Sequence, residues 1–286
     1  MDASLDESFR YCENLARREA RHFYPAFRLL PKDQRRGMCA LYAFMRIADD
    51  LSDEPGAVED KRRRLAEWRQ TLRQALAGVY AHPSHPALHQ TVTTFGVPAA
   101  YLEALIDGVE MDLAATSYAT FAELRNYCWH VASVVGLTCL HIWGCRDERA
   151  RQFAESAGIG FQLTNILRDL KEDSNRGRIY LPQEDLTRFG YDADRLRRGV
   201  CDHAYRNLMR FQVERARSFY DSAWPLGALL PRPGRTMFLL MARTYRSLLD
   251  VIERRDYDVF SRRIRVSRWR KLMLALGTLP VRLGWQ

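Results

Sequence analysis

Carboxylate and amide side chains recur every four residues in the segment 161–182, FQLTNILRDLKEDSNRGRIYLP. Asn165, Asp169 and Asp173 span about 80° of arc at helical geometry, so all three project from one face of a helix. Gln162 joins that face one turn earlier, whereas leucine and isoleucine occupy the other sides. A polar stripe on an apolar helix either faces solvent or forms a polar wall inside a cavity.

A second acidic cluster lies far upstream, in the segment 40–54, ALYAFMRIADDLSDE. Asp49 and Asp53 are one helical turn apart, Asp50 follows Asp49 directly, and Arg46 falls on the same face. Like charges crowded into one turn cost stability unless a cation is present. Because this arrangement repeats that of the first segment, we favour a polar wall over a solvated face.

Two such walls predict a particular chemistry. Mg²⁺ takes oxygen ligands in octahedral geometry, and it binds proteins through one or two carboxylates together with substrate phosphates. Metal ions held between the walls would stabilise diphosphate as a leaving group. An apolar cavity between the helices would hold the rest of such a substrate. The residues therefore predict a metal–diphosphate site.

Helical periodicity dominates the chain, and strand patterns are almost absent. The apolar segment 121–144 has few charges and is expected to be central. Helices are expected at 6–23, 32–51, 59–76, 98–113, 121–144, 147–173, 192–198, 202–223, 232–255 and 268–277, with a short one after Pro182 and a loop at 81–86. No composition break divides residues 1–286, so we predict a single all-α domain with helices layered around a central cavity.

The composition restricts the class of protein. The chain has 286 residues, is 47% hydrophobic and carries a net charge of +9. A basic excess favours nucleic acid, anionic lipid or phosphorylated small molecules as partners. The arginines are scattered and no DNA-binding motif is present, so we predict no nucleic-acid partner and keep a basic helical nucleic-acid-binding protein as the non-enzyme alternative. The six cysteines form no C-x-x-C pair and are expected to be reduced, buried thiols of a cytoplasmic protein.

Two further features have a simple and a functional interpretation. His82, His85 and His89 have spacing suited to a metal, but we interpret them as surface residues of a proline-broken loop. The basic run 262–271 precedes the apolar stretch LMLALGTLPVRLGW. Together they fit a surface helix that attaches the protein to the inner face of the cytoplasmic membrane, or a last helix packed on the bundle. No apolar run is long enough to span a membrane, and the acidic N-terminus is not a signal peptide.

The pairing of YAFMRIADDLSDE with QLTNILRDLKEDSNRGRIYLP resembles the squalene/phytoene synthases, which are head-to-head prenyl transferases. The resemblance covers nearly the whole chain. It implies the all-α isoprenoid synthase fold, two or three Mg²⁺ ions, and condensation of two allylic prenyl diphosphates through a cyclopropyl diphosphate. The proton lost in that step would go to the released diphosphate or to Tyr127.

The resemblance also implies roles for individual residues. The implied metal ligands are Asp49, Asp53, Asn165, Asp169 and Asp173. The implied catalytic residues are the four aspartates of that set and Tyr127. The implied substrate-binding residues are Phe23, Arg46, Asp50, Gln162, Asn165, Arg178, Tyr180, Tyr245 and Arg265. Many members of the family carry serines just before the phenylalanine, where this chain has Arg21 and His22.

The runs LIDGVEMDL and RRDYDVFSRRIRVSRWRKL are most similar to bacterial presqualene diphosphate synthases of hopanoid pathways. The similarity implies farnesyl diphosphate as substrate, presqualene diphosphate as product, and downstream isoprenoid-pathway enzymes as partners. The alternatives are a phytoene synthase that uses two geranylgeranyl diphosphates, and a full squalene or dehydrosqualene synthase. We expect NADPH not to be used, although the missing glycine-rich fingerprint decides little because squalene synthases bind NADPH without one. A catalytically silent subunit of the same fold is disfavoured by the complete aspartate clusters.

Overall fold

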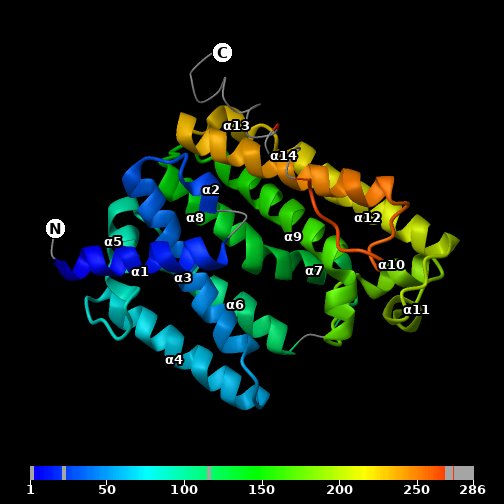
Figure 1. The fold of residues 1–286 in the computed structure, drawn as a ribbon, viewed down its shortest axis with the longest axis horizontal. Helices are drawn as coiled ribbons and strands as arrows, with labels where there is room; N and C mark the ends of the chain where they lie inside the picture. Colours follow the sequence, from blue (N-terminus) through cyan, green and yellow to red (C-terminus); the bar gives the residue numbers. More distant parts are fainter. Residues whose placement is uncertain (1–2, 21–23, 115–116, 268–272, 274–286) are drawn as a thin grey trace.

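All the secondary-structure elements in the described part of the chain are helices (Figure 1). The computed structural model describes residues 3–20, 24–114, 117–267 and 273. Within these ranges the only β-type pairing is an isolated parallel bridge between Ser117 and Ile179. The all-α prediction is therefore confirmed.

The helices in chain order are α1 (Ala3–Glu19), α2 (Tyr24–Phe27), α3 (Lys32–Asp53), α4 (Val58–Leu76), α5 (His85–Phe95), α6 (Ala99–Ala114), α7 (Phe121–Cys128), the π-helical turn η1 (Trp129–Ser133), α8 (Val134–Trp143), α9 (Ala150–Asn175), α10 (Gln183–Arg188), α11 (Ala193–Arg197), α12 (His203–Ala223), α13 (Leu226–Leu229) and α14 (Arg232–Arg254). Most of the expected helices are present with ends that differ by a few residues. The expected helix 6–23 ends at Glu19, and the expected helix 268–277 lies almost wholly outside the described residues.

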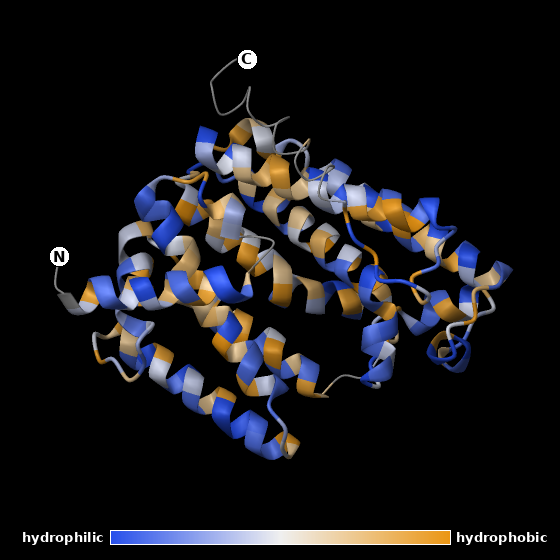
Figure 2. Ribbon diagram, in the orientation of Figure 1, coloured by the Kyte–Doolittle hydropathy of each residue, from blue (hydrophilic) through white to orange (hydrophobic). Residues whose placement is uncertain are grey.

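Helix α9 is the central element. It packs against α12 and α14 on one side and against η1 and α8 on another (Figure 1). Its first half joins the hydrophobic cluster built largely by α1–α6 and α8, whereas its second half joins the cluster built by α7 and α10–α12. Peripheral helices such as α4 expose a largely hydrophilic surface (Figure 2).

Two acidic helix ends are fixed by local chain chemistry. Helix α3 stops at Asp53 because Glu54 precedes Pro55, and a residue before proline is driven out of the helical region; Glu54 has φ −55° and ψ 140°. Helix α9 stops before Gly177, whose φ of 78° is readily adopted only by glycine. Both aspartate clusters therefore lie in the final turns of their helices.

The segment 121–143 is central, as expected, but it is not one uniform helix. The turn η1 has π-type hydrogen bonding, and it lies between α6 and α9. A Cβ atom on Gly158 of α9 would lie 2.4 Å from the Cα of Ser133, so only glycine fits there. The hydroxyl of Ser133 donates to the carbonyl of Glu155 at 2.8 Å. Such π turns inside helices are frequent at functional sites.

Helix α5 contradicts the interpretation of His85 as a surface residue, whereas His82 and His89 are partly exposed. Pro86 lies in the first turn of α5, where a missing N–H costs nothing, so the helix starts inside the expected loop. His85 is only 1% exposed, and its ring packs against Trp68 at a centroid distance of 5.1 Å. Burial lowers the pKa of His85 to about 4, so it is a neutral core residue.

Within the described ranges, the cysteines form no disulfide bonds with one another, as predicted. All six cysteines are free thiols; Cys12, Cys39, Cys128 and Cys139 are buried, and the other two are partly buried. No described helix combines the length and the hydropathy that crossing a bilayer requires.

Candidate active site

An apolar cavity of about 270 Å³ lies between α3 on one side and α9 and α14 on the other. Along α3 it is lined by Met38, Tyr42 and Met45. Along α9 it is lined by Gly158 and Asn165, among others. In both helices the next turn after the lining residues carries an aspartate of the acidic clusters. The cavity therefore leads from an apolar interior to the acidic ends of both helices.

The α3 side presents three carboxylates around one arginine. The carboxylate of Asp50 pairs with Arg46 at 2.5 Å, and Nε of Arg46 is buried with no hydrogen-bond partner among the described residues. Asp49 and Asp53 are exposed at the end of the helix. The structure thus separates one charge-neutralised aspartate from two that have no ion-pair partner in the described part of the chain.

The α9 side presents Gln162, Asn165, Asp169 and Asp173 on one face, as the spacing predicts. The amide of Asn165 donates to Gln162 at 3.4 Å, and its Oδ1 atom is buried with no hydrogen-bond partner among the described residues. Asp169 forms an ion pair with the neighbouring Arg168. The ring of Tyr245, on α14, packs edge-on against Phe161 at 4.8 Å and lies close to Asn165 and Arg168.

Asp112, near the end of α6, joins the two acidic walls and is not among the residues predicted from the sequence. It raises the pKa of Asp49 on α3 and of Asp173 on α9, so it lies near both. Its carboxylate accepts hydrogen bonds from the hydroxyls of Tyr127 at 3.1 Å and Tyr180 at 2.8 Å. The signal was present in LIDGVEMDL, as a carboxylate near the end of an apolar helix.

Arg178 and Tyr180 belong to a loop that closes over Asp112. Arg178 donates to the backbone carbonyl of Asp112 at 3.0 Å. The bridge between Ser117 and Ile179 holds this loop beside the chain that follows α6. The rings of Tyr127 and Tyr180 stack at 5.3 Å. The structure therefore brings three of the predicted residues together around an acid that was not predicted.

Burial and neighbouring carboxylates raise the pKa of two aspartates in the acidic walls. The pKa of Asp49 is raised to about 7, first because protein surrounds it and then because of Asp53, Asp112 and Asp50; Arg46 opposes the shift. Asp49 is nevertheless open to solvent on one side, which fits a group at the mouth of a concave site. The pKa of Asp173 is raised to about 7 by burial and by Asp169. A helix C-terminus also disfavours anions.

This donor set fits Mg²⁺. The candidate ligands are hard oxygen atoms, one of them the buried and unpartnered Oδ1 of Asn165. Burial raises the pKa of Asp49 and Asp173 most, and a cation would offset the repulsion from neighbouring carboxylates that adds to this shift. No group of three or more acidic, histidine or cysteine side chains within the described ranges is close enough to hold a metal alone. Mg²⁺ that binds through one or two carboxylates and substrate phosphates does not need such a group.

The remaining predicted residues are placed less directly. Arg265 is exposed in the segment after α14, two residues beyond Arg263, whose guanidinium lies 3.4 Å from Glu172 of α9. Phe23 lies outside the described residues. Tyr127 does not line the cavity, since its hydroxyl points to Asp112. The roles of all these residues stay predictions.

Comparisons with known proteins agree with this geometry. The family model described as squalene/phytoene synthase matches residues 16–270. The 15-cis-phytoene synthase of Synechococcus elongatus is 36% identical over 98% of this chain and 93% of its own length.

Two solved structures are similar in fold. Squalene synthase HpnC from Alicyclobacillus acidocaldarius superposes with a TM-score of 0.86 at 29% identity, over 90% of this chain and 97% of that one. A dehydrosqualene synthase in complex with a ligand superposes with a TM-score of 0.89 at 29% identity, over 98% of both chains.

Proposed function

Because the chain belongs to the squalene/phytoene synthase family and is a prenyl transferase, we propose that it joins two allylic prenyl diphosphates head to head and releases diphosphate. The observation that carries this proposal is the arrangement of the two acidic helix ends. Those of α3 and α9 lie at the same end of one apolar cavity, with Asp112 between them.

Asp49 and Asp53 on one side, and Asn165, Asp169 and Asp173 on the other, would hold Mg²⁺. When bound, Mg²⁺ supplies charge neutralisation for substrate phosphates and for the departing diphosphate. Arg178, whose guanidinium already lies beside Asp112, would add a positive charge at the same end. The apolar lining of the cavity would hold the prenyl chains and keep water from the allylic cation.

The proposed condensation proceeds in three steps. The donor's C–O bond breaks, its electron pair leaves with diphosphate, and an allylic cation remains. The C2–C3 double bond of the acceptor attacks this cation, and loss of a proton closes the cyclopropane. Burial keeps Tyr127 neutral by raising its pKa well above the usual range, and its proton is donated to Asp112. A neutral phenol is a poor base, so we assign proton removal to the released diphosphate.

We propose farnesyl diphosphate as substrate and presqualene diphosphate as product. The structural similarity to a squalene synthase and a dehydrosqualene synthase supports this choice. The alternative is phytoene formation from two geranylgeranyl diphosphates, and the name of the relative from Synechococcus elongatus supports it. Attachment to the inner face of the cytoplasmic membrane also stays a proposal, because most of the C-terminal basic and apolar segment lies outside the described residues.

The experiment measures diphosphate released and prenyl substrate consumed, with Mg²⁺ and either farnesyl or geranylgeranyl diphosphate, with and without NADPH. A reaction that stops at the cyclopropyl diphosphate releases one diphosphate for every two substrates consumed. A reaction that continues to a hydrocarbon releases both. No release from either substrate would refute the proposed function.

A further inference from the structure

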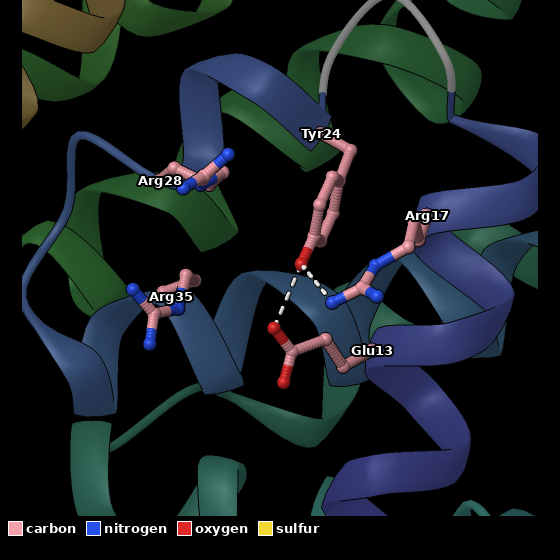
Figure 3. A pocket seen from close by; sticks show the side chains of 5 residues that line it. All are labelled: Glu13, Arg17, Tyr24, Arg28 and Arg35. Carbon is pink, nitrogen blue, oxygen red and sulfur yellow. Dashed lines mark hydrogen bonds between the residues drawn. The ribbon is translucent and has the colours of Figure 1, made fainter.

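A basic pocket of about 600 Å³ lies where α1, α2 and α3 meet (Figure 3). It is lined by Glu13, Arg17, Tyr24, Arg28 and Arg35. Three guanidiniums and one carboxylate give these residues a net formal charge of +2. Among the described residues, no side chain that lines the apolar cavity also lines this pocket.

One side of the pocket is fixed by hydrogen bonds around the buried Tyr24. Its hydroxyl donates to the carboxylate of Glu13 at 2.7 Å and accepts from Arg17 at 3.3 Å. The hydrogen bond to Tyr24 raises the pKa of Arg17 above its usual range. Glu13 is thus held on the Tyr24 side, away from Arg28 and Arg35 (Figure 3).

The other side carries two guanidiniums that have no partner in the described part of the chain. Arg28 follows α2 and Arg35 lies in the first turns of α3, and Figure 3 shows both side chains across the opening from Tyr24. Nε of Arg35 is buried without a hydrogen-bond acceptor among the described residues. The adjacent Arg36, by contrast, pairs with Asp6 at 3.1 Å.

We propose that this pocket binds a phosphate group, either of free phosphate or diphosphate or of a lipid headgroup. Planar guanidiniums bind phosphate through paired, charge-assisted hydrogen bonds, and the donors of Arg28 and Arg35 are available for them. The site is separate from the acidic one. Arg35 precedes Asp49 by fourteen residues of the same helix, which corresponds to about 21 Å along its axis.

The test is a calorimetric titration of inorganic diphosphate into the whole protein at physiological ionic strength. EDTA is present so that the acidic walls have no Mg²⁺ through which to bind diphosphate. We expect Arg28→Gln/Arg35→Gln to weaken binding by about tenfold or more, because two charge-assisted hydrogen-bonding groups are lost. The charge-matched control is Arg62→Gln/Arg63→Gln on the exposed face of α4, which should bind like the wild type.

A second arm distinguishes the two sources of phosphate. Flotation with phosphatidylcholine vesicles, with and without phosphatidic acid, measures headgroup binding by the same variants. The proposal is supported if the Arg28/Arg35 variant loses binding of diphosphate or of the vesicles while the control keeps it. The arm in which binding is lost identifies the source of the phosphate group. Equal loss in both double variants, or no binding of either anion by the wild type, would overturn it. If the double variant does not fold, Arg28→Gln alone carries the test, since Arg28 is exposed.

Discussion

Asp169 is the residue on which the proposed metal site depends most directly. It lies one turn from both Asn165 and Asp173 on the cavity-facing side of α9, and its only ion-pair partner in the described ranges is Arg168. We expect Asp169→Ala to reduce diphosphate release by about 10²–10³-fold or more, because charge stabilisation of the leaving group is lost.

The matched control is Glu148→Ala, since the side chain of Glu148 is 86% exposed just before α9 begins. This variant should keep its activity, and both variants should keep the helical circular dichroism spectrum. An active Asp169→Ala enzyme would remove Asp169 from the metal site.

Asp112 provides a second prediction, because it holds two tyrosine hydroxyls between the acidic walls. Asp112→Asn preserves the side-chain shape and removes the charge, so we expect a fall in kcat of about 10–100-fold with a smaller change in KM. Asp107→Asn on the same helix is the control, because Asp107 pairs with Arg69 at 2.7 Å instead. Equal kinetics in the two variants would assign Asp112 a structural role only.

Asp173 links the site to stability. Its pKa is raised to about 7 in the folded protein, so between about pH 4 and 7 the folded state binds more protons than the unfolded state. Its contribution to stability is therefore present at low pH and lost as the pH rises towards 7. In EDTA at pH 8, Asp173→Asn should be more stable than the wild type by about 1 kcal/mol after allowance for solvent screening, and inactive.

Thermal unfolding at pH 4 and pH 8 measures this difference. We expect a gain in Tm of about 2–4 °C at pH 8, little gain at pH 4, and a smaller gain at pH 8 when Mg²⁺ is added. A variant that is less stable than the wild type at pH 8 in EDTA would contradict the raised pKa.

Sequence spacing was sufficient for residues that share one helix. Asn165, Asp169 and Asp173 follow from a four-residue period, and so do Asp49 and Asp53. Asp112 could not be found in this way, because its function depends on Tyr127 and Tyr180 from two other segments. Such contacts form only when the helices pack, and no local period encodes them.

The same distinction applies to whole elements. Amphipathic periods predicted the long helices α3, α4, α9, α12 and α14 to within a few residues. Helix α5 was missed because Pro83 and Pro86 suggested a loop, although Pro86 lies in the first turn, where a helix tolerates proline. The short helices α2 and α13 have no period to detect. The π turn η1 depends on its close packing against α9, which is a tertiary effect.

Gly158 tests that packing at the scale of elements. A Cβ atom there would meet backbone atoms of Ala132 and Ser133 at 2.7 Å or less, and backbone atoms cannot move aside cheaply. We expect Gly158→Ala to destabilise the protein by about 1–3 kcal/mol and to lower activity, because the shifted turn η1 lines the cavity.

The control is Gly227→Ala on α13, where the nearest side-chain atom would lie 3.6 Å from the new Cβ, an ordinary contact. Urea denaturation of both variants measures the difference. Equal stability of the two variants would show that α9 and η1 can separate without cost.

At the scale of the molecule, the acidic site joins two hydrophobic clusters. Ala154 and Ala157 of α9 belong to the first cluster, whereas Leu163 and Leu167 of the same helix belong to the second. Helix α14 is divided in the same way. The acidic ends of α3 and α9 come from different clusters, so the site exists only when both are folded.

Shared helices predict that residues 1–286 unfold as one unit. If one cluster melted alone, half of α9 and half of α14 would lose their packing, and the remaining half would expose buried leucines to water. We expect one calorimetric transition whose calorimetric and van't Hoff enthalpies agree, with fluorescence and far-ultraviolet circular dichroism reporting the same midpoint. Mg²⁺ with inorganic diphosphate should shift that single transition upward, because it binds only the folded site. Two resolved transitions, of which only one responds to these ligands, would divide the chain into separate domains and contradict the single-domain prediction.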